Sequence, residues 1–267
     1  MTSRRRLDAE LVRRGLAPSR EAAQAFVVQG RVLVAGSLAD KASRLVAAGE
    51  PIELAGPPPR FASRGGDKLD AALDRFAVEV AGRDALDAGA STGGFTDCLL
   101  QRGAVAVTAL DVGYGQLHER LRADPRVRVL DRTNVRHFVA DAPFEVVVAD
   151  LSFISLATVA PALLGPNAAP GADVVVLVKP QFEAGRAEAS RRRGVIRDPR
   201  VWRRVLGEVG VALEGQGAAM MGAMVSPLTG AGGNVEFLVH LHAHVAPSPG
   251  AHVDLDAVVD SAVDLVR

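Results

Sequence analysis

The stretch Leu86-Asp87-Ala88-Gly89-Ala90-Ser91-Thr92-Gly93-Gly94-Phe95 decides how this chain is expected to fold. It joins a short apolar run to a segment with helical spacing. Glycines between a buried strand and a helix permit a tight turn and let a ligand approach the main chain. The spacing is not G-x-G-x-x-G, and an acid two residues before the first glycine would repel a pyrophosphate. Asp87 suits a positively charged ligand, although an NAD-binding loop or a plain tight turn stays open as an alternative.

Outward from this loop, apolar runs alternate with helical segments. The runs lie at 84–88, 105–111, 127–130, 145–150 and 173–178, and the helical segments lie near 94–102, 116–122, 155–164 and 199–212. This alternation predicts an α/β fold, with a mostly parallel sheet and helices on both faces. Two further strands, 217–225 and 234–242, are separated only by a turn and predict an antiparallel hairpin. We therefore expect the seven-stranded sheet of Rossmann-like class I methyltransferases, with an antiparallel last strand.

Polar residues at successive strand ends predict the ligand of the glycine loop. Asp111 ends the second strand, where a carboxylate can accept both hydroxyls of a ribose, and Asn134 follows the third in the segment DRTN. Asp87 suits a sulfonium and an amino group. The sequence thus predicts an S-adenosylmethionine site formed by Asp87, Gly89, Ser91, Gly93, Gly94, Phe95, Asp111 and Asn134.

Four charged residues lie beside apolar neighbours. Asp150 and Lys179 end two predicted strands, Glu236 lies within a third, and Lys68 precedes the first core strand. Such charges are costly to bury unless they pair. The set fits methyl transfer to a ribose 2′-hydroxyl, a poor nucleophile that needs a base. We assign Lys179 as the base and Lys68, Asp150 and Glu236 as its partners; a structural salt-bridge network is the alternative.

The first 59 residues read as a separate small α+β domain. Helical spacing over 7–16 and 20–29 is followed by strands near 31–36 and 50–54 and then by a proline-rich segment. We predict an RNA-binding domain over 1–59, a linker over 60–63 and a methyltransferase domain over 64–267. Residues 1–31 contain seven arginines against three acids, and 186–204 contain eight against two, which favours a polyanionic partner over two merely solvated faces.

Two resemblances extend this interpretation. Arg6-Leu7-Asp8, Gly15 to Arg20 and Gly30 to Val34 resemble the RNA-binding module first described in ribosomal protein S-four, whose arginines grip phosphates. The resemblance implies RNA contacts for Arg4, Arg6, Arg20 and Arg31, to which we add Arg64. The segments SRGGDKL, LDAGASTGGFTDCLL, LDVGYGQL, DRTN, VVADLSFISL, LVKPQFEAG, GVIRDP and GNVEF resemble the TlyA family of ribosomal RNA cytidine 2′-O-methyltransferases, which is related to FtsJ/RrmJ-type enzymes with a Lys-Asp-Lys-Glu tetrad.

This second resemblance implies methylation of cytidine in ribosomal RNA of the small subunit, the large subunit or both. Family members without the N-terminal and C-terminal extensions act on the large subunit alone. The arginine-rich start and a candidate helix over 254–266 favour both subunits here. The loop between Glu183 and Gly194 departs from the family pattern, so its contacts cannot be carried over.

Other features argue for a cytoplasmic enzyme without a metal. No apolar run reaches eighteen residues, and the first fourteen do not read as a signal peptide. Cys98 is the only cysteine and predicts a packed thiol; Trp202 is expected to pack as well. His240, His242 and His244 alternate, but without a further ligand nearby we expect an edge-strand surface. We expect no metal, no membrane and no obligate protein partner. The rival functions are an RNA-binding protein with a decayed methyltransferase domain, a membrane-active haemolysin and a transfer RNA methyltransferase.

Overall fold

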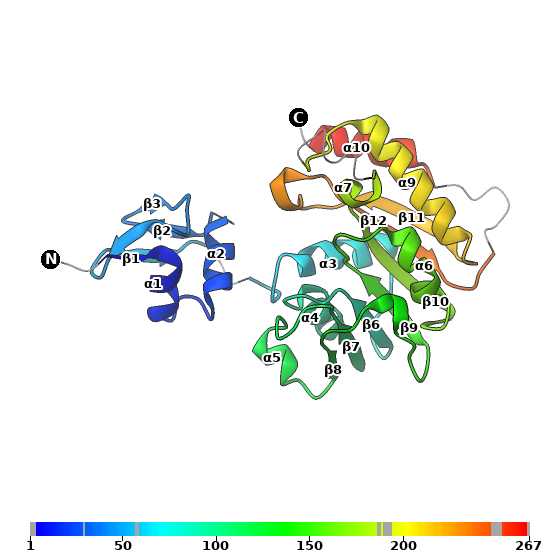
Figure 1. Cartoon of the computed structure of the whole chain (residues 1–267), viewed down its shortest axis with the longest axis horizontal. Coiled ribbons are helices and arrows are strands. Elements are labelled where there is room, and N and C mark those ends of the chain that lie inside the picture. Colours follow the sequence, from blue (N-terminus) through cyan, green and yellow to red (C-terminus); the bar gives the residue numbers. More distant parts are fainter. Residues whose placement is uncertain are drawn as a thin grey trace. The chain divides into compact units, whose positions relative to one another are not determined.

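The chain forms two compact units in a computed structural model, residues 1–58 and residues 59–267 (Figure 1). The structure describes residues 4–28, 30–56, 59–185, 188, 194–246 and 253–265. Within those ranges, no helix is long and apolar enough to cross a membrane.

The first unit combines two helices with five short strands. Its elements are β1 (Arg4–Arg6), α1 (Leu7–Arg13), α2 (Arg20–Val28), β2 (Val32–Val34), β3 (Ser37–Leu38), β4 (Leu45–Ala47) and β5 (Ile52–Leu54). β1 pairs with β4, and β2 lies between β3 and β5, all antiparallel. Leu7, Leu11 and Val27 of the helices are buried against Val32 and Val46 of the strands. The two helices were predicted. Strands of two or three residues are too short for an alternating pattern, so β1, β3 and β4 were missed.

The second unit holds the large sheet. Its elements are α3 (Gly65–Phe76), β6 (Asp84–Ala88), α4 (Gly94–Gln101), β7 (Ala106–Leu110), α5 (Glu119–Arg122), β8 (Val127–Leu130), the 3-10 helix η1 (Val135–His137), β9 (Phe144–Ala149), α6 (Leu156–Leu164), β10 (Ala168–Val178), α7 (Pro180–Glu183), α9 (Pro199–Glu214), β11 (Ala219–Val225), the 3-10 helix η2 (Ala231–Gly233), β12 (Phe237–His242) and α10 (Leu255–Leu265).

The sheet has seven strands in the order β11-β12-β10-β9-β6-β7-β8. β6 to β10 are mutually parallel, and β12 lies antiparallel between β10 and β11. The predicted fold class, its five parallel strands and the closing hairpin are confirmed. β10 is five residues longer at its start than the predicted run 173–178, and its pairing with β9 shifts register there.

Alternate residues of the buried strands belong to two different hydrophobic clusters. Val174, Val176 and Val178 of β10 pack with α6 and α9, whereas Val175 and Leu177 pack with α3 and α4. Because side chains of a strand point alternately to opposite faces, an unbroken apolar run is the pattern of a strand covered on both faces. The helices therefore form one layer on each side of the sheet.

Residues 60–63, for which the sequence predicts a linker, pack on the second unit. Phe61 is buried in the cluster of α3 and α4, and Asp97 accepts a hydrogen bond from the Ala62 amide at 2.7 Å. A Cβ atom on Gly66 would lie 2.3 Å from the Phe61 ring, so the glycine lets this ring lie against the first turn of α3. Paired glycines disfavour helix, which is why the sequence did not indicate α3.

Candidate active site

The carboxyl ends of the central strands meet at one edge of the sheet. In the strand registers, Ala88 pairs with Ala149, Ala149 pairs with Val176, and Val178 pairs with Phe237. The next residue along each chain segment is the one of interest: Gly89 follows Ala88, Asp150 follows Ala149, Lys179 follows Val178, and Glu236 precedes Phe237. These positions belong to four adjacent strands of the sheet, β6, β9, β10 and β12. The Asp150 amide donates to the Ala88 carbonyl at 3.1 Å, which fixes β6 and β9 at this level. Three of the four predicted catalytic residues, Asp150, Lys179 and Glu236, therefore come from neighbouring positions at the ligand-binding edge of an open sheet, beside the glycine loop.

Lys179 and Asp150 form the first of two ion pairs at this edge. The Lys179 Nζ lies 2.5 Å from Asp150 Oδ1 and 3.0 Å from the Ser152 hydroxyl oxygen. Lys179 is also the residue before α7, whose first helical position is Pro180. Because proline at that position fixes the backbone at the start of a helix, it holds the turn that carries the lysine.

Lys68 and Glu236 form the second pair. The Lys68 Nζ lies 2.5 Å from Glu236 Oε2, and both side chains are buried. A Cβ atom on Gly230 would lie 1.9 Å from Glu236 Oε1, so the backbone at Gly230 covers the carboxylate closely. The neighbouring Thr229 carbonyl accepts a hydrogen bond from Arg64 at 3.4 Å. Arg64, predicted to bind RNA, thus lies in the second unit close to this pair.

The glycine loop is held by close backbone contacts. Gly89 and Gly93 have φ angles of 89° and 95°, which L side chains rarely adopt. A Cβ atom on Gly89 would lie 2.6 Å from the Asp150 carbonyl oxygen, and one on Gly94 would lie 2.3 Å from the Ser63 hydroxyl oxygen. The loop is therefore pressed against the Asp150 turn on one side and the start of α3 on the other, and Phe95 is buried behind it.

Asp87 lies below this loop rather than on its surface. Its carboxylate is fully buried and accepts a hydrogen bond from the Thr96 hydroxyl at 2.6 Å, while Oδ1 has no hydrogen-bond partner. Burial raises the pKa of Asp87 to about 7, with a further rise from the charge of Asp150. A positive charge bound above the loop would favour its ionised form, so Asp87 can attract a cation through its charge without a direct contact.

Asp111 and Asn134 line the next two strand ends. Asp111 accepts hydrogen bonds from the amides of Ser91 at 2.9 Å and Gly113 at 2.7 Å, and it is only partly buried. Each carboxylate oxygen keeps a second lone pair for a ligand hydroxyl. Asn134 is exposed and accepts from the Arg136 amide at the start of η1. Asp111 can accept the hydroxyls of a ribose, and Asp87 favours a positive charge. This pair of carboxylates fits S-adenosylmethionine better than a pyrophosphate.

Two exposed aromatic side chains near this edge escaped the sequence reasoning. Phe153 is 90% exposed, has a φ angle of 65°, and lies 4.9 Å from the Phe182 ring, measured between centroids. Phe182 in turn lies 6.0 Å from the Lys179 Nζ. Tyr114, after Asp111, is exposed under the Arg132 guanidinium. A positive φ angle is unfavourable for a bulky residue such as Phe153, and residues strained in this way cluster at functional sites. The sequence alone does not distinguish an exposed aromatic residue from a buried one.

In the first unit, the buried carboxylate of Asp8 orders two of the predicted RNA-binding arginines. Arg6 donates to both oxygens of Asp8 at 3.1 and 2.9 Å, Arg20 donates at 3.1 Å, and Gln24 donates at 3.1 Å. Both guanidinium groups remain about half exposed. Arg4 is exposed on β1. The unit therefore presents ordered cationic groups at its surface.

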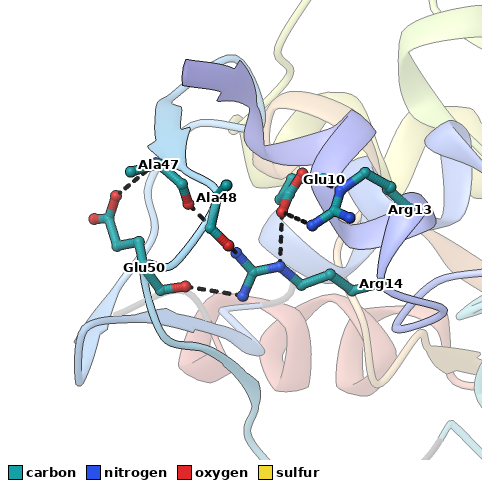
Figure 2. Close-up of polar contacts among 6 residues, drawn as sticks. All are labelled: Glu10, Arg13, Arg14, Ala47, Ala48 and Glu50. Carbon is teal, nitrogen blue, oxygen red and sulfur yellow. Dashed lines mark hydrogen bonds and ion pairs between the residues drawn. The ribbon is translucent and has the colours of Figure 1, made fainter. Parts of the chain in front are cut away.

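Arg31 and Arg14 of this unit are also bound to its backbone. Arg31 donates to the Ala55 carbonyl at 3.3 Å and lies over the Phe26 ring. Glu10 accepts from Arg13 and Arg14, and Arg14 also donates to the carbonyls of Ala48 at 2.9 Å and Glu50 at 2.8 Å (Figure 2). This network joins α1 to the turn after β4. Arg186 and Arg191 to Arg193 of the second basic stretch lie outside the described residues.

Three other predictions have clear outcomes. Cys98 is a fully buried thiol, and burial raises its pKa to about 12. Trp202 is fully buried and donates to the Ile196 carbonyl at 3.0 Å, so it packs as expected. The expected edge-strand surface for the histidines is wrong, because β12 lies between β10 and β11 and His240 is buried. Strand order cannot be deduced from the periodicity of one strand.

Comparison with known proteins identifies relatives for both units. Residues 61–243 match the FtsJ-like methyltransferase family, and residues 5–52 match the S4 domain. The chain is 49% identical to the 16S/23S rRNA (cytidine-2′-O)-methyltransferase TlyA of Mycobacterium tuberculosis, over 90% of this chain and 91% of the relative. It is 37% identical to Hemolysin A of Brachyspira hyodysenteriae, over 88% and 98%. A solved structure from Streptococcus thermophilus that carries a hemolysin name is 37% identical, with a TM-score of 0.78 over 99% of this chain and 97% of that one.

Proposed function

Because the chain belongs to the TlyA family of FtsJ-like methyltransferases, we propose that it transfers a methyl group from S-adenosylmethionine to cytidine 2′-hydroxyls of ribosomal RNA. The observation that carries the proposal is the pair of ion pairs, Lys179–Asp150 and Lys68–Glu236, at the same sheet edge as the glycine loop. A relative that is 49% identical is named for this reaction on 16S and 23S rRNA, and one that is 33% identical, from Campylobacter jejuni, is named for 23S rRNA.

S-adenosylmethionine supplies an electrophilic methyl group on a sulfonium. The residues that would hold it are Asp111 for the ribose, Asn134 at the third strand end, and the Gly89 to Gly94 loop for close main-chain approach. Asp87 contributes negative charge from beneath the glycine loop. When it is ionised, Asp87 supplies a negative charge that favours a sulfonium and an amino group, whereas the charge of Asp150 is paired with Lys179.

Lys179 is the proposed base. Its Nζ donates to the Asp150 carboxylate and to the Ser152 hydroxyl oxygen, and these two contacts hold the amine at this edge. As the base it takes up the proton of the ribose hydroxyl on the electron pair of Nζ, and that proton then passes to solvent. Asp150 positions the lysine, and the Lys68–Glu236 pair joins α3 to the start of β12.

Phe153 is the proposed contact for a nucleobase. The Phe153 ring is almost fully exposed and lies beside the Phe182 ring, which in turn lies near the Lys179 Nζ. Phe153 therefore offers a planar apolar surface close to the catalytic lysine. Bases that leave a helical stack are commonly held by aromatic side chains, which contribute roughly 1–3 kcal/mol each. A base held there would keep its ribose near the lysine, which a 2′-hydroxyl reaction requires.

We further propose that the substrate is ribosomal RNA of both the small and the large subunit, in the cytoplasm. Arg4, Arg6 and Arg20 of the S4 domain supply phosphate contacts, which give affinity without sequence selection. Similarity to the relative named for both rRNAs, over nine-tenths of each chain, favours both subunits over one.

The decisive experiment maps 2′-O-methyl groups on 16S, 23S and transfer RNA from cells with and without the gene. We expect cytidine methylation to disappear from ribosomal RNA alone, and the purified chain to restore it on subunits with labelled S-adenosylmethionine. Loss from transfer RNA instead would assign another substrate. No loss anywhere would indicate an RNA-binding protein whose methyltransferase domain is inactive, and liposome leakage without methyl transfer would favour a hemolysin.

A further inference from the structure

Three side chains of types that bind metal ions, one aspartate and two histidines, lie together far from the proposed active site. His240 Nε2 lies 2.7 Å and His242 Nε2 lies 3.1 Å from the same oxygen of Asp173, Oδ1. The three ligand atoms all lie within 4.8 Å of one another. We propose that Asp173, His240 and His242 form a binding site for a divalent transition metal ion of the zinc type.

The sheet places these side chains on one face. His240 and His242 are two residues apart on β12, so they point the same way, and Asp173 of β10 lies directly opposite His242 in the antiparallel register. Gly222 of β11 lies opposite His240, and because it has no side chain it leaves space beside the His240 ring. Phe76 of α3 occupies that space and stacks on the His240 ring at 5.3 Å, which limits the orientation of the imidazole.

The ligand set selects the class of ion. Two imidazole nitrogens and one carboxylate oxygen suit Zn²⁺, Co²⁺ or Ni²⁺, whereas Mg²⁺ and Ca²⁺ prefer sites built from oxygen alone. Tetrahedral zinc with bonds of about 2.0–2.2 Å keeps ligand atoms roughly 3.3 Å apart, so the two contacts to Asp173 need to open by about 0.2–0.6 Å, and the two imidazole nitrogens already lie within 4.8 Å of each other. Each histidine binds as the neutral imidazole, with its proton on Nδ1 and its Nε2 lone pair on the metal.

A neighbouring arginine orients the carboxylate for this role. Arg83 Nη1 lies 2.7 Å from Asp173 Oδ2, the oxygen that the histidines do not contact, and also donates to the Glu79 carbonyl at 2.6 Å. Oδ1 is thereby directed at the two imidazoles. Such outer contacts are a usual feature of metal sites.

An adjoining cavity gives the ion access and room for water. The cavity has a volume of about 1210 Å³ and is lined by Phe76, Asp173, His240, His242, Val258 and Ser261, among others. Three protein ligands leave at least one coordination position for water from this space. Asp173 lies six residues before Lys179 on β10, roughly 20 Å at the rise of a strand, so the proposed metal is not part of methyl transfer.

The test uses the full chain without an affinity tag, stripped with EDTA and titrated with Zn²⁺ by calorimetry and with Co²⁺ by visible absorption. We expect one ion per chain and a cobalt spectrum of low coordination number. His242→Gln and Asp173→Asn should each lower zinc affinity at least about tenfold, since even outer-shell changes commonly cost that much. His244→Gln is the matched control, because His244 contacts the carbonyls of Gly165 and Ala168 instead.

Zinc should also raise the thermal midpoint of the parent chain and of His244→Gln but not of the two ligand variants, which circular dichroism must show to be folded. No stoichiometric binding, or equal binding in His242→Gln, Asp173→Asn and the parent, would overturn the proposal. Methyl transfer should be unchanged in all three variants, so failure of the metal site leaves the proposed function intact.

Discussion

Lys68 and Glu236 are 168 residues apart in the sequence, yet their side chains form a buried 2.5 Å ion pair between α3 and the start of β12. Removing one partner of such a pair leaves an uncompensated charge in the interior, which typically costs about 3–5 kcal/mol. We therefore expect Lys68→Met to lower the free energy of unfolding by an amount of this order in urea titrations.

The double variant Lys68→Met with Glu236→Gln should recover most of that stability, because no unpaired charge remains. If the pair also serves catalysis, methyl transfer should stay low in the double variant although it is folded. Recovery of both stability and activity would reduce the pair to a structural bridge.

Lys179 offers a direct test of base against positioning. Lys179→Arg keeps a positive charge for Asp150 but cannot accept a proton at neutral pH, whereas Lys179→Met removes charge and base together. Loss of a general base typically lowers the rate about 10²- to 10⁴-fold. We expect both variants to lose single-turnover methyl transfer to this extent while they bind cofactor and subunits. A Lys179→Arg enzyme with near-normal rates would show that the cation only positions the hydroxyl.

Asp87 should make cofactor binding depend on pH. Because burial raises its pKa to about 7, the carboxyl is mainly protonated at pH 6 and mainly ionised at pH 8. A positively charged ligand favours the ionised form, so binding below pH 7 must release a proton. Affinity should then rise with pH, by up to about tenfold per unit below pH 7, and level off above it.

Calorimetry of S-adenosylmethionine binding at pH 6, 7 and 8, in two buffers of different ionisation enthalpy, measures both the affinity and the proton. Asp87→Asn cannot ionise and should bind weakly, with little pH dependence. The same slope in Asp87→Asn and in the parent would assign the proton to another group.

Acid should loosen the first unit through Glu10. Hydrogen bonds from Arg13 and Arg14 lower the pKa of this carboxyl to about 2, from an ordinary value of 4.5 (Figure 2). The stabilisation is complete above pH 4.5 and is lost as the pH falls towards 2. Hydrogen exchange of peptides from α1, corrected for intrinsic rates, should show protection at pH 5 that declines by pH 3.

Glu10→Gln should show the lower protection already at pH 5, because the amide cannot form the two ion pairs. Glu21→Gln, at an exposed glutamate on α2, is the control and should match the parent. Equal protection in Glu10→Gln and the parent at pH 5 would mean that this network does not hold α1.

The sequence predicted much more of the sheet than of the contacts at its edge. Buried parallel strands are continuous apolar runs, and β6 and β8 begin and end at the predicted residues because loops with glycine or charge bound them. The partner of each catalytic lysine was not predictable, since a pairing such as Lys68 with Glu236 depends on the order of strands. Nor could the sequence show that Asp87 is buried or that Phe153 is exposed, because both depend on how a loop turns above the sheet.

The same limit applies to Asp173. Asp173 is the first residue of the predicted run 173–178 and was not considered as a ligand, and the histidines were judged on sequence neighbours alone. Its register opposite His242 comes from the insertion of β12 between β10 and β11. Long-range pairing of this kind is set by the packing of the whole sheet, not by the period of one strand.

Arg4, Arg6 and Arg20 should determine how salt affects ribosomal subunit binding. Each phosphate contact contributes roughly 0.7–0.9 to the slope of log affinity against log salt. The triple glutamine variant should bind more weakly and with a smaller slope.

Asp8→Asn keeps all three cations but weakens the hydrogen bonds that order Arg6 and Arg20, so it should lower affinity while the slope stays near the parent value. Binding measured between 50 and about 200 mM salt separates these two effects. Arg126→Gln, at an exposed arginine of the second unit paired with Asp124, is the control for loss of a surface arginine outside the first unit. Hydrogen exchange must confirm that the first unit of Asp8→Asn is folded. If the triple variant keeps the slope of the parent, these arginines do not contact phosphates and β1 is not part of the RNA-binding surface.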